Sequence, residues 1–299
     1  MKHLFEENLD DFYEYLLLGP LSTLYTAKKK TSATELIEYS NLIIDKFAIH
    51  SASFFHLSKG IIELRNSGEK VKMTGYDLFT VNSTFRAMME NYATFNNIFI
   101  ESKTTEEQWF RFLLWKIDGL FEKQKFDIAE SDFEGAKEIL EKDKLILENT
   151  IQEFESLPFY QSLDPRQLYK IYKVDKSGKE KFNWRFTIDE NGSITPLKIS
   201  DLIKHTCRIK AFTNNYRYTS IHTHTNYLAI EHFQQMRGIP ISDKYTKPIT
   251  KLAIYLTCLF IRDMCILDEN AKSEFQTLPY MVRDYIDGMA NTIKKTYSI

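Results

Sequence analysis

Apolar residues recur every three or four positions along most of the chain, the spacing that places them on one face of an α-helix. Capping residues support the assignment, as where Thr104 stands three residues before Glu107. The pattern predicts helices over about 5–18, 32–67, 76–100, about twenty residues from 104, then 131–156, 216–236, 247–267 and 280–295. Gly19-Pro20 is expected to end the first of these helices. The fold class is therefore predicted to be mainly α, a helical bundle.

The helical spacing of apolar residues is interrupted between residues 173 and 197. A polar, lysine-containing stretch leads into the alternating run Phe182 to Ile188, and Asn191-Gly192 then supplies a strong hairpin signal before Ser193 to Leu197. We predict a small β-hairpin inserted between helices. Asp164-Pro165 is expected to open a short helix before it, and Ser200-Asp201 another after it.

The chain has 299 residues, which we interpret as a single helical domain over 1–299 with 173–197 as an insertion. Lys and Arg total 39 and Asp and Glu total 41, so a nucleic-acid site would have to be a local patch. The most apolar segment, 252–261, is about half as long as the ~20 residues that a membrane span needs. We expect a cytoplasmic protein that does not enter a membrane, with reduced core thiols at its three cysteines.

Common catalytic signatures are missing from the sequence. It contains no Walker-type phosphate loop, no dinucleotide-binding glycine fingerprint, no His-Glu-x-x-His helix and no Gly-x-Ser-x-Gly elbow. Nucleotide hydrolysis, nicotinamide chemistry and the common hydrolase mechanisms therefore lack support. No cofactor is expected.

Histidines concentrate in the segment 217–232, which holds three of the seven. Imidazoles suit a metal ion, but on a helix His222 and His224 lie about 200° apart and cannot chelate one ion. Only a strand over 219–225, where residues do alternate, would bring them to one face. The helical interpretation predicts no metal site here.

Read as one helix from 216 to 236, this segment separates polar from apolar positions. The polar arc spans about 60° and contains Arg217, Ser220, His224, Glu231 and Gln235. His222 and His232 fall in the adjoining apolar arc and are interpreted as core or boundary histidines. His224 is the better catalytic candidate, because an arginine and a carboxylate two turns away on either side could tune its imidazole. A hydrogen-bonded boundary histidine is the structural alternative.

The predicted helix over 76–100 carries a second polar stripe. Asn82, Arg86 and Glu90 lie on one side of it beside an aromatic face, and Arg86 and Glu90 are four residues apart and can pair. Amides and an arginine next to aromatics suggest a partly buried polar seam with satisfied hydrogen bonds. The seam is expected to lie between this helix and that of His224, and either fixes helix register or supports a site.

Two sets of residues carry a resemblance. Thr84 to Glu90 on one helix, with Tyr218 to Ser220 and His224 on a later one, resembles an uncharacterised family of bacterial all-helical proteins. Arg217 followed by His222 or His224 is similar to the arginine, four to six residues, histidine motif of HEPN-type helical bundles. Many HEPN proteins are metal-independent RNA nucleases of defence and toxin systems.

The HEPN resemblance implies cleavage of RNA in a defence or stress system. His224 would act as general acid or base and Arg217 would stabilise the transition state, at a homodimer interface. A small polar or amide residue commonly follows the motif arginine, whereas Tyr218 follows it here. The alternatives are a non-catalytic interaction protein and a protein that binds a small ligand between its helices.

Overall fold

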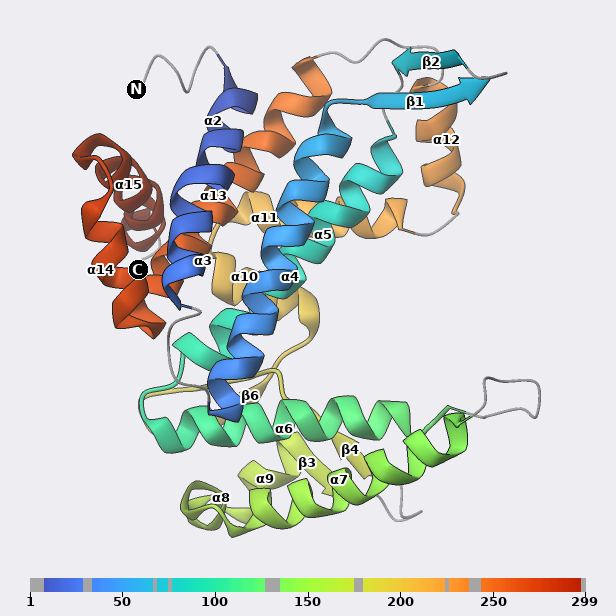
Figure 1. The fold of residues 1–299 in the computed structure, drawn as a ribbon. Helices are drawn as coiled ribbons and strands as arrows, with labels where there is room; N and C mark the ends of the chain where they lie inside the picture. The colour runs from blue at the N-terminus through green and yellow to red at the C-terminus, as the bar shows by residue number, and fades with distance from the viewer. Residues whose placement is uncertain are drawn as a thin grey trace. The chain divides into compact units, whose positions relative to one another are not determined.

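The computed structural model describes residues 8–28, 34–66, 69–74, 77–126, 135–174, 180–223, 226–236 and 243–296. Packing divides the chain into two compact units. Unit 1 consists of Met1–Asn96 and Ile203–Ile299, and unit 2 of Asn97–Leu202. The fold is mainly helical, as the sequence predicts, with short antiparallel strand pairs (Figure 1). The sequence-based expectation of a single domain stays a prediction.

Over its described residues, the first part of unit 1 contains four α-helices, a π-helical turn and one strand pair. Its elements are α2 (Leu9–Leu16), η1 (Leu17–Leu21), α3 (Ser22–Lys28), α4 (Glu35–Ser58), β1 (Ile61–Asn66), β2 (Glu69–Thr74) and α5 (Leu78–Phe95). The expected helix end at Gly19-Pro20 is wrong, because Pro20 lies inside the π-helical turn η1 and the chain continues directly into α3. The wider turn accommodates a residue without an N–H.

The predicted helix over 32–67 is wrong beyond residue 58. The helix α4 ends at Ser58, and Gly60 follows in the left-handed region with φ of 60° while its N–H donates to the Leu57 carbonyl at 3.0 Å. This left-handed glycine closes the helix. The next six residues then pair with β2, Ile62 opposite Met73 and Leu64 opposite Val71. Ser32, the expected cap, lies outside the described residues, and Thr34 caps the helix by accepting from the Ile37 N–H.

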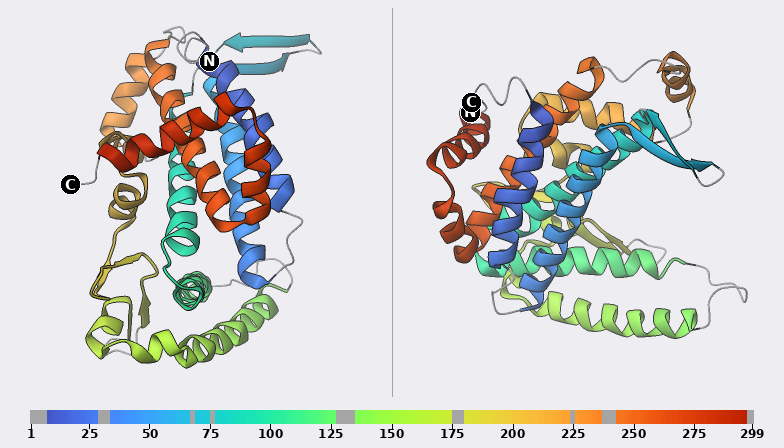
Figure 2. Two further views of the ribbon diagram at one scale, coloured as in Figure 1. Left: turned by 90° about the vertical axis from the view of Figure 1, so that its left-hand side faces the viewer. Right: turned by 45° about the horizontal axis from the view of Figure 1, so that its top comes forward.

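The second part of unit 1 is entirely helical over its described residues. It contains α10 (Ile199–Cys207), which begins in unit 2, then α11 (Lys210–His222), α12 (Tyr227–Met236), α13 (Asp243–Leu267), α14 (Glu269–Thr277) and α15 (Tyr280–Thr296). The long helix α13 packs against α2, α4, α5 and α15 (Figure 2). Its Phe260 ring stacks on that of Phe47, with the ring centroids 3.9 Å apart, and contacts that of Phe95, with the centroids 4.8 Å apart. These rings form the aromatic core of this unit.

The expected continuous helix over 216–236 is wrong. The helix α11 ends at His222, and α12 begins only at Tyr227. Asn226 caps the new helix by accepting from the Ala229 N–H at 2.9 Å, and its amide donates back to the Ile221 carbonyl at 3.1 Å. The apolar period survives this break, which is why the pattern alone suggests one helix.

Unit 2 combines helices with the predicted β insertion. Its elements are η2 (Asn96–Ile100), α6 (Thr105–Lys123), α7 (Ala136–Ser156), α8 (Pro158–Ser162), α9 (Pro165–Ile171), β3 (Tyr172–Val174), β4 (Glu180–Phe182), β5 (Phe186–Ile188) and β6 (Ile194–Pro196). The caps at Thr104 and Asp164 are confirmed. Ser131, the expected start of α7, lies outside the described residues. The insertion holds two antiparallel pairs, β3 with β4 and β5 with β6 around Gly192, whose φ is 76°.

The core of unit 2 forms where α6 and α7 lie side by side (Figure 1 and Figure 2). Phe110 of α6 stacks on Phe154 of α7 at 4.7 Å and meets Phe186 of β5 at 6.1 Å. Arg111 is 2% exposed; it pairs with Glu107 at 2.9 Å and donates to the Phe186 carbonyl at 3.0 Å. This charge is therefore buried only because it is paired and hydrogen-bonded.

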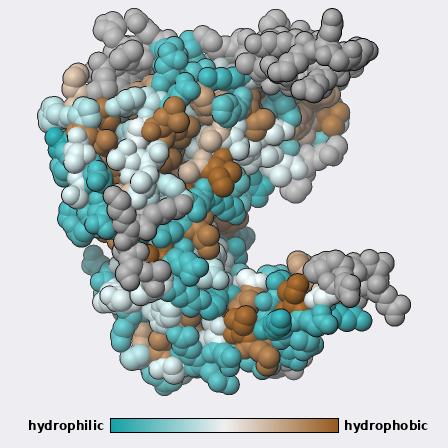
Figure 3. Space-filling view, viewed as in Figure 1, coloured by the Kyte–Doolittle hydropathy of each residue, from teal (hydrophilic) through white to brown (hydrophobic). Residues whose placement is uncertain are grey.

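The outer surface is mixed in character. Apolar residues appear as separate patches among hydrophilic ones on the face drawn in Figure 3. Among the described helices, none is long and apolar enough to cross a membrane. All three cysteines are buried and unbridged, and burial raises the pKa of each thiol. They are core residues, as the sequence predicts.

Candidate functional site

The helix α5 presents the predicted polar stripe within unit 1. Asp77 caps the helix by accepting from the N–H groups of Phe79 and Thr80. One turn apart, Arg86 and Glu90 make the expected pair, with Arg86 Nε 2.9 Å from Glu90 Oε1. The pair is only partly exposed, at 23% and 37% of the two side chains.

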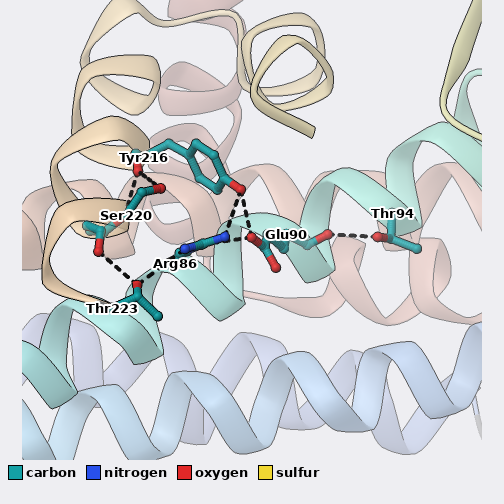
Figure 4. Close-up of polar contacts among 7 residues, drawn as sticks. Arg86, Glu90, Thr94, Tyr216, Ser220 and Thr223 are labelled. Carbon is teal, nitrogen blue, oxygen red and sulfur yellow. Dashed lines mark hydrogen bonds and ion pairs between the residues drawn. The ribbon is translucent and has the colours of Figure 1, made fainter. Parts of the chain in front are cut away.

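The helix α11 completes this pair with a tyrosine and a threonine (Figure 4). Tyr216 donates its hydroxyl proton to Glu90 at 2.8 Å and accepts from Arg86 Nη2 at 3.2 Å. Thr223, at the end of α11, accepts from Arg86 Nη1 at 3.3 Å. The four residues Arg86, Glu90, Tyr216 and Thr223 form what we call the seam network. It joins α5 to α11 through charge-assisted hydrogen bonds.

The seam network stabilises the charged state of Arg86. Burial lowers the pKa of Arg86, but the hydrogen bond and charge of Glu90, with Tyr216, outweigh it, so that the pKa is raised overall. Burial, and then the hydrogen bond and charge of Glu90, raise the pKa of Tyr216 to about 12. At neutral pH the phenol is therefore a fixed hydrogen-bond donor to Glu90.

The remaining predicted site residues do not form one cluster with the network. Asn82 is 1% exposed, and its Nδ2 has no hydrogen-bond partner among the described residues. Ser220 donates locally to the Tyr216 carbonyl at 2.7 Å. Arg217 is exposed on α11, and Glu231 is half-buried on α12, so the break between these helices separates two residues that the sequence placed on one face. His224 lies outside the described residues.

A groove of about 550 Å³ opens beside the seam network, in the size range of small-molecule sites. It is lined by residues of α4, α5, α11 and α12 together with Thr223, all in unit 1. The lining residues are His50, Phe79, Thr80, Ser83, Thr84, Ala87, His222, Thr223 and Ile230. Thr223 belongs to both features, so the groove and the seam network share a wall.

Two histidines line the groove with unpartnered nitrogens. His222 is 3% exposed, and its Nδ1 is buried without a hydrogen-bond partner among the described residues; the same holds for Nε2 of the half-buried His50. Burial, and then Lys46, lower the pKa of His50. Burial, and then His232, lower that of His222. Both imidazoles are therefore neutral at neutral pH, when each offers one donor and one acceptor.

Aromatic neighbours fix the orientation of His222. The rings of Tyr218 and Phe79 contact it edge-on, with ring centroids 4.5 and 5.4 Å from its own. His232 Nδ1 lies 3.4 Å from His222 Nε2. Because Nε2 contacts His232, Nδ1 is the ring nitrogen left without a partner among the described residues. His222 falls in the apolar arc predicted from the sequence, and its burial agrees with that. A free nitrogen on a lined groove was not anticipated.

The hydroxyls of the groove were also missed from the sequence. Thr80, Ser83 and Thr84 stand at spacings of three and four on α5, a pattern that would have revealed a polar stripe turned toward a neighbour. His50 offers no such signal, because its place beside α5 depends on the packing of α4 against it. Among the described residues, no group of three or more His, Cys, Asp or Glu side chains is arranged to hold a metal ion.

A comparison with protein families matches residues 51–238 to DUF5677, described as a family of unknown function. The chain belongs to the DUF5677 family. The match contains the whole seam network and every lining residue of the groove except His50, which stands one position before it. It ends before α13 begins. No curated protein and no solved structure shows a significant match.

Proposed function

We propose that this DUF5677 protein binds a small polar molecule in the groove between α4, α5, α11 and α12. One observation carries the proposal: His222 lines a groove of about 550 Å³, and its Nδ1 is buried without a hydrogen-bond partner among the described residues. Buried polar atoms are nearly always hydrogen-bonded, so a bound molecule is the expected partner. The neighbouring seam network supports the groove by fixing α11 against α5.

Binding is tested by the ring C–H signals of the histidines in NMR spectra. His50→Asn and His222→Asn assign two of the signals, and a library of several hundred small polar fragments is then added to the wild-type protein. A groove ligand should shift the signals of His50 and His222 and leave that of His205 on α10 in place. If no fragment in the library moves the two groove signals, the proposed function is wrong.

A blocking variant provides the matched control. Ser83→Phe places a ring at a half-buried groove position, and Thr94→Phe places the same ring at a half-buried position of α5 that does not line the groove. Fragments that bind the groove should lose affinity for the first variant and keep it for the second. Equal affinity for both variants would place the binding elsewhere.

The second candidate function is an HEPN-like, metal-independent RNA nuclease. The observation that favours it is that α11 carries both Arg217 and His222, five positions apart, and that the lowered pKa of His222 leaves a neutral imidazole able to accept a proton. His224, the residue first expected to act, would follow just beyond the helix end. A homodimer that pairs two such helices would provide a composite RNA site.

The nuclease function is tested by RNA cleavage without added metal. The wild type is compared with Arg217→Ala, His222→Ala and His224→Ala, all purified by the same procedure. Loss of cleavage in the arginine variant and in one histidine variant would support catalysis. Equal background cleavage in all four proteins would exclude it and leave the binding function standing.

A further inference from the structure

Three of the four groove hydroxyls, those of Thr80, Thr84 and Thr223, can only accept hydrogen bonds from a bound molecule. Each hydroxyl carries one proton, and three of the four lining hydroxyls have already donated it. Thr84 donates to the Thr80 carbonyl at 2.8 Å, Thr223 donates to the Thr219 carbonyl at 2.9 Å, and Thr80 donates to the Asp77 carboxylate. A molecule that lies against these oxygens must therefore supply the protons.

The described residues that line the groove carry no formal charge at neutral pH. Among them is no carboxylate, lysine or arginine, and His50 and His222 are neutral there. Charged groups that act on the lining have both signs: Lys46 on His50, Arg86 on Thr223 and Asp77 on Thr80. These charges together favour neither an anion nor a cation.

Apolar surface occupies the rest of the lining. Phe79 and Ala87 from α5 and Ile230 from α12 line the groove together with the hydroxyls, so a bound molecule needs an apolar side as well as donors. From the acceptor oxygens, the missing charge and this apolar surface we infer that the groove takes a neutral, hydroxyl-rich ring compound, of the class of sugars and unphosphorylated nucleosides. This inference rests on the proposed binding function.

The test adds five probes separately to the full-length protein while the His50 and His222 ring signals are recorded. D-glucose and adenosine are the neutral donor-rich probes, inorganic phosphate and citrate the anions, and spermidine the cation. We expect glucose or adenosine to shift both signals and the three charged probes to leave them unchanged. Stronger binding of phosphate, citrate or spermidine would overturn the inference but leave groove binding intact.

Threonine variants then test the acceptor role. Thr84→Val removes the hydroxyl and keeps the shape, and should weaken the neutral probe about fivefold, the effect of one lost hydrogen bond. Thr84→Ser keeps the hydroxyl and should bind within about twofold of the wild type, since the oxygen still accepts. The matched control is Thr94→Val, because Thr94 is also half-buried on α5 and donates to the Glu90 carbonyl at 2.8 Å.

The outcomes separate the two claims. If neither neutral probe binds while charged fragments of the library do, the ligand class is wrong and the proposed function survives. If the whole library leaves His50 and His222 unmoved, both are wrong. If Thr84→Val and Thr94→Val bind the neutral probe equally, the hydroxyl oxygens are not its acceptors, and the inference fails.

Discussion

Tyr216 connects the two charges of the seam network by one hydroxyl. It donates to Glu90 and accepts from Arg86, so Tyr216→Phe leaves both groups short of a hydrogen bond in a partly buried place. We expect the free energy of unfolding to fall by about 1–2 kcal/mol. Urea denaturation monitored by circular dichroism measures the change. Tyr227→Phe is the control, since Tyr227 is 78% exposed and its variant should stay within about 0.5 kcal/mol of the wild type.

Acidification should destabilise the protein through two histidines. The pKa values of His50 and His222 are lowered from 6.5 in the folded state, so the unfolded chain binds more protons between the lowered and the ordinary values. The free energy of unfolding is then at its full value above pH 6.5 and falls as the pH drops through the folded pKa values. Urea midpoints from pH 7.5 to 5 should show this decline.

The double variant His50→Asn with His222→Asn removes the two imidazoles responsible. Its urea midpoint should depend less on pH over the same range, whatever its stability at pH 7.5. An unchanged slope would assign the pH dependence to other groups. Replacing His56 by Asn provides the control, because that side chain is exposed on the same helix as His50.

At the residue scale, the sequence predicts what local spacing determines. Arg86 and Glu90 pair because a helix brings positions four apart together, and that could be foreseen. The roles of Tyr216 and Thr223 could not be foreseen, because they depend on which turn of α11 meets α5. His50 entered no sequence argument for the same reason, since it reaches the groove only through the packing of α4 on α5.

At the scale of elements, helix starts were predictable where a capping side chain accepts a hydrogen bond from a nearby backbone N–H. Thr104 and Asp164 begin helices as expected. The helix end expected at Gly19-Pro20 was wrong, because the proline lies within a π-helical turn. The break after His222 escaped notice because the apolar period resumes in α12 with little change of phase. Asn226, a favourable cap residue inside an apparent helix, was the available signal.

Gly60 decides where α4 ends, and its left-handed backbone can be tested. Gly60→Ala should lower the free energy of unfolding by about 1 kcal/mol, because an L side chain is strained at φ of 60°. Gly288→Ala, within α15, should instead raise it by about 0.5–1 kcal/mol, since the new methyl group meets nothing within 4 Å and alanine favours a helix. Urea denaturation distinguishes the two signs. Two changes of the same sign would contradict this account of Gly60.

At the scale of the whole molecule, the contacts form two units, one of them continuous in sequence. Residues 97–202 contain the Phe110, Phe154 and Phe186 core and the Arg111 pair with Glu107. We expect this segment, produced alone, to be helical and to unfold cooperatively on heating, as circular dichroism would show. A gradual, non-cooperative loss of signal would mean that unit 2 depends on the rest of the chain. Arg111→Met serves as a destabilised comparison.

Unit 1, by contrast, is assembled from the two ends of the chain, and this has a consequence for synthesis on the ribosome. Phe47 and Phe95 leave the exit tunnel long before Phe260, the ring of α13 that both contact. At about 5–20 residues per second the interval is on the order of ten to forty seconds. During this interval the aromatic side chains of α4 and α5 that pack against α13 in the folded protein remain without that helix. Chaperone binding to nascent chains should therefore concentrate on these two helices and cease once α13 emerges.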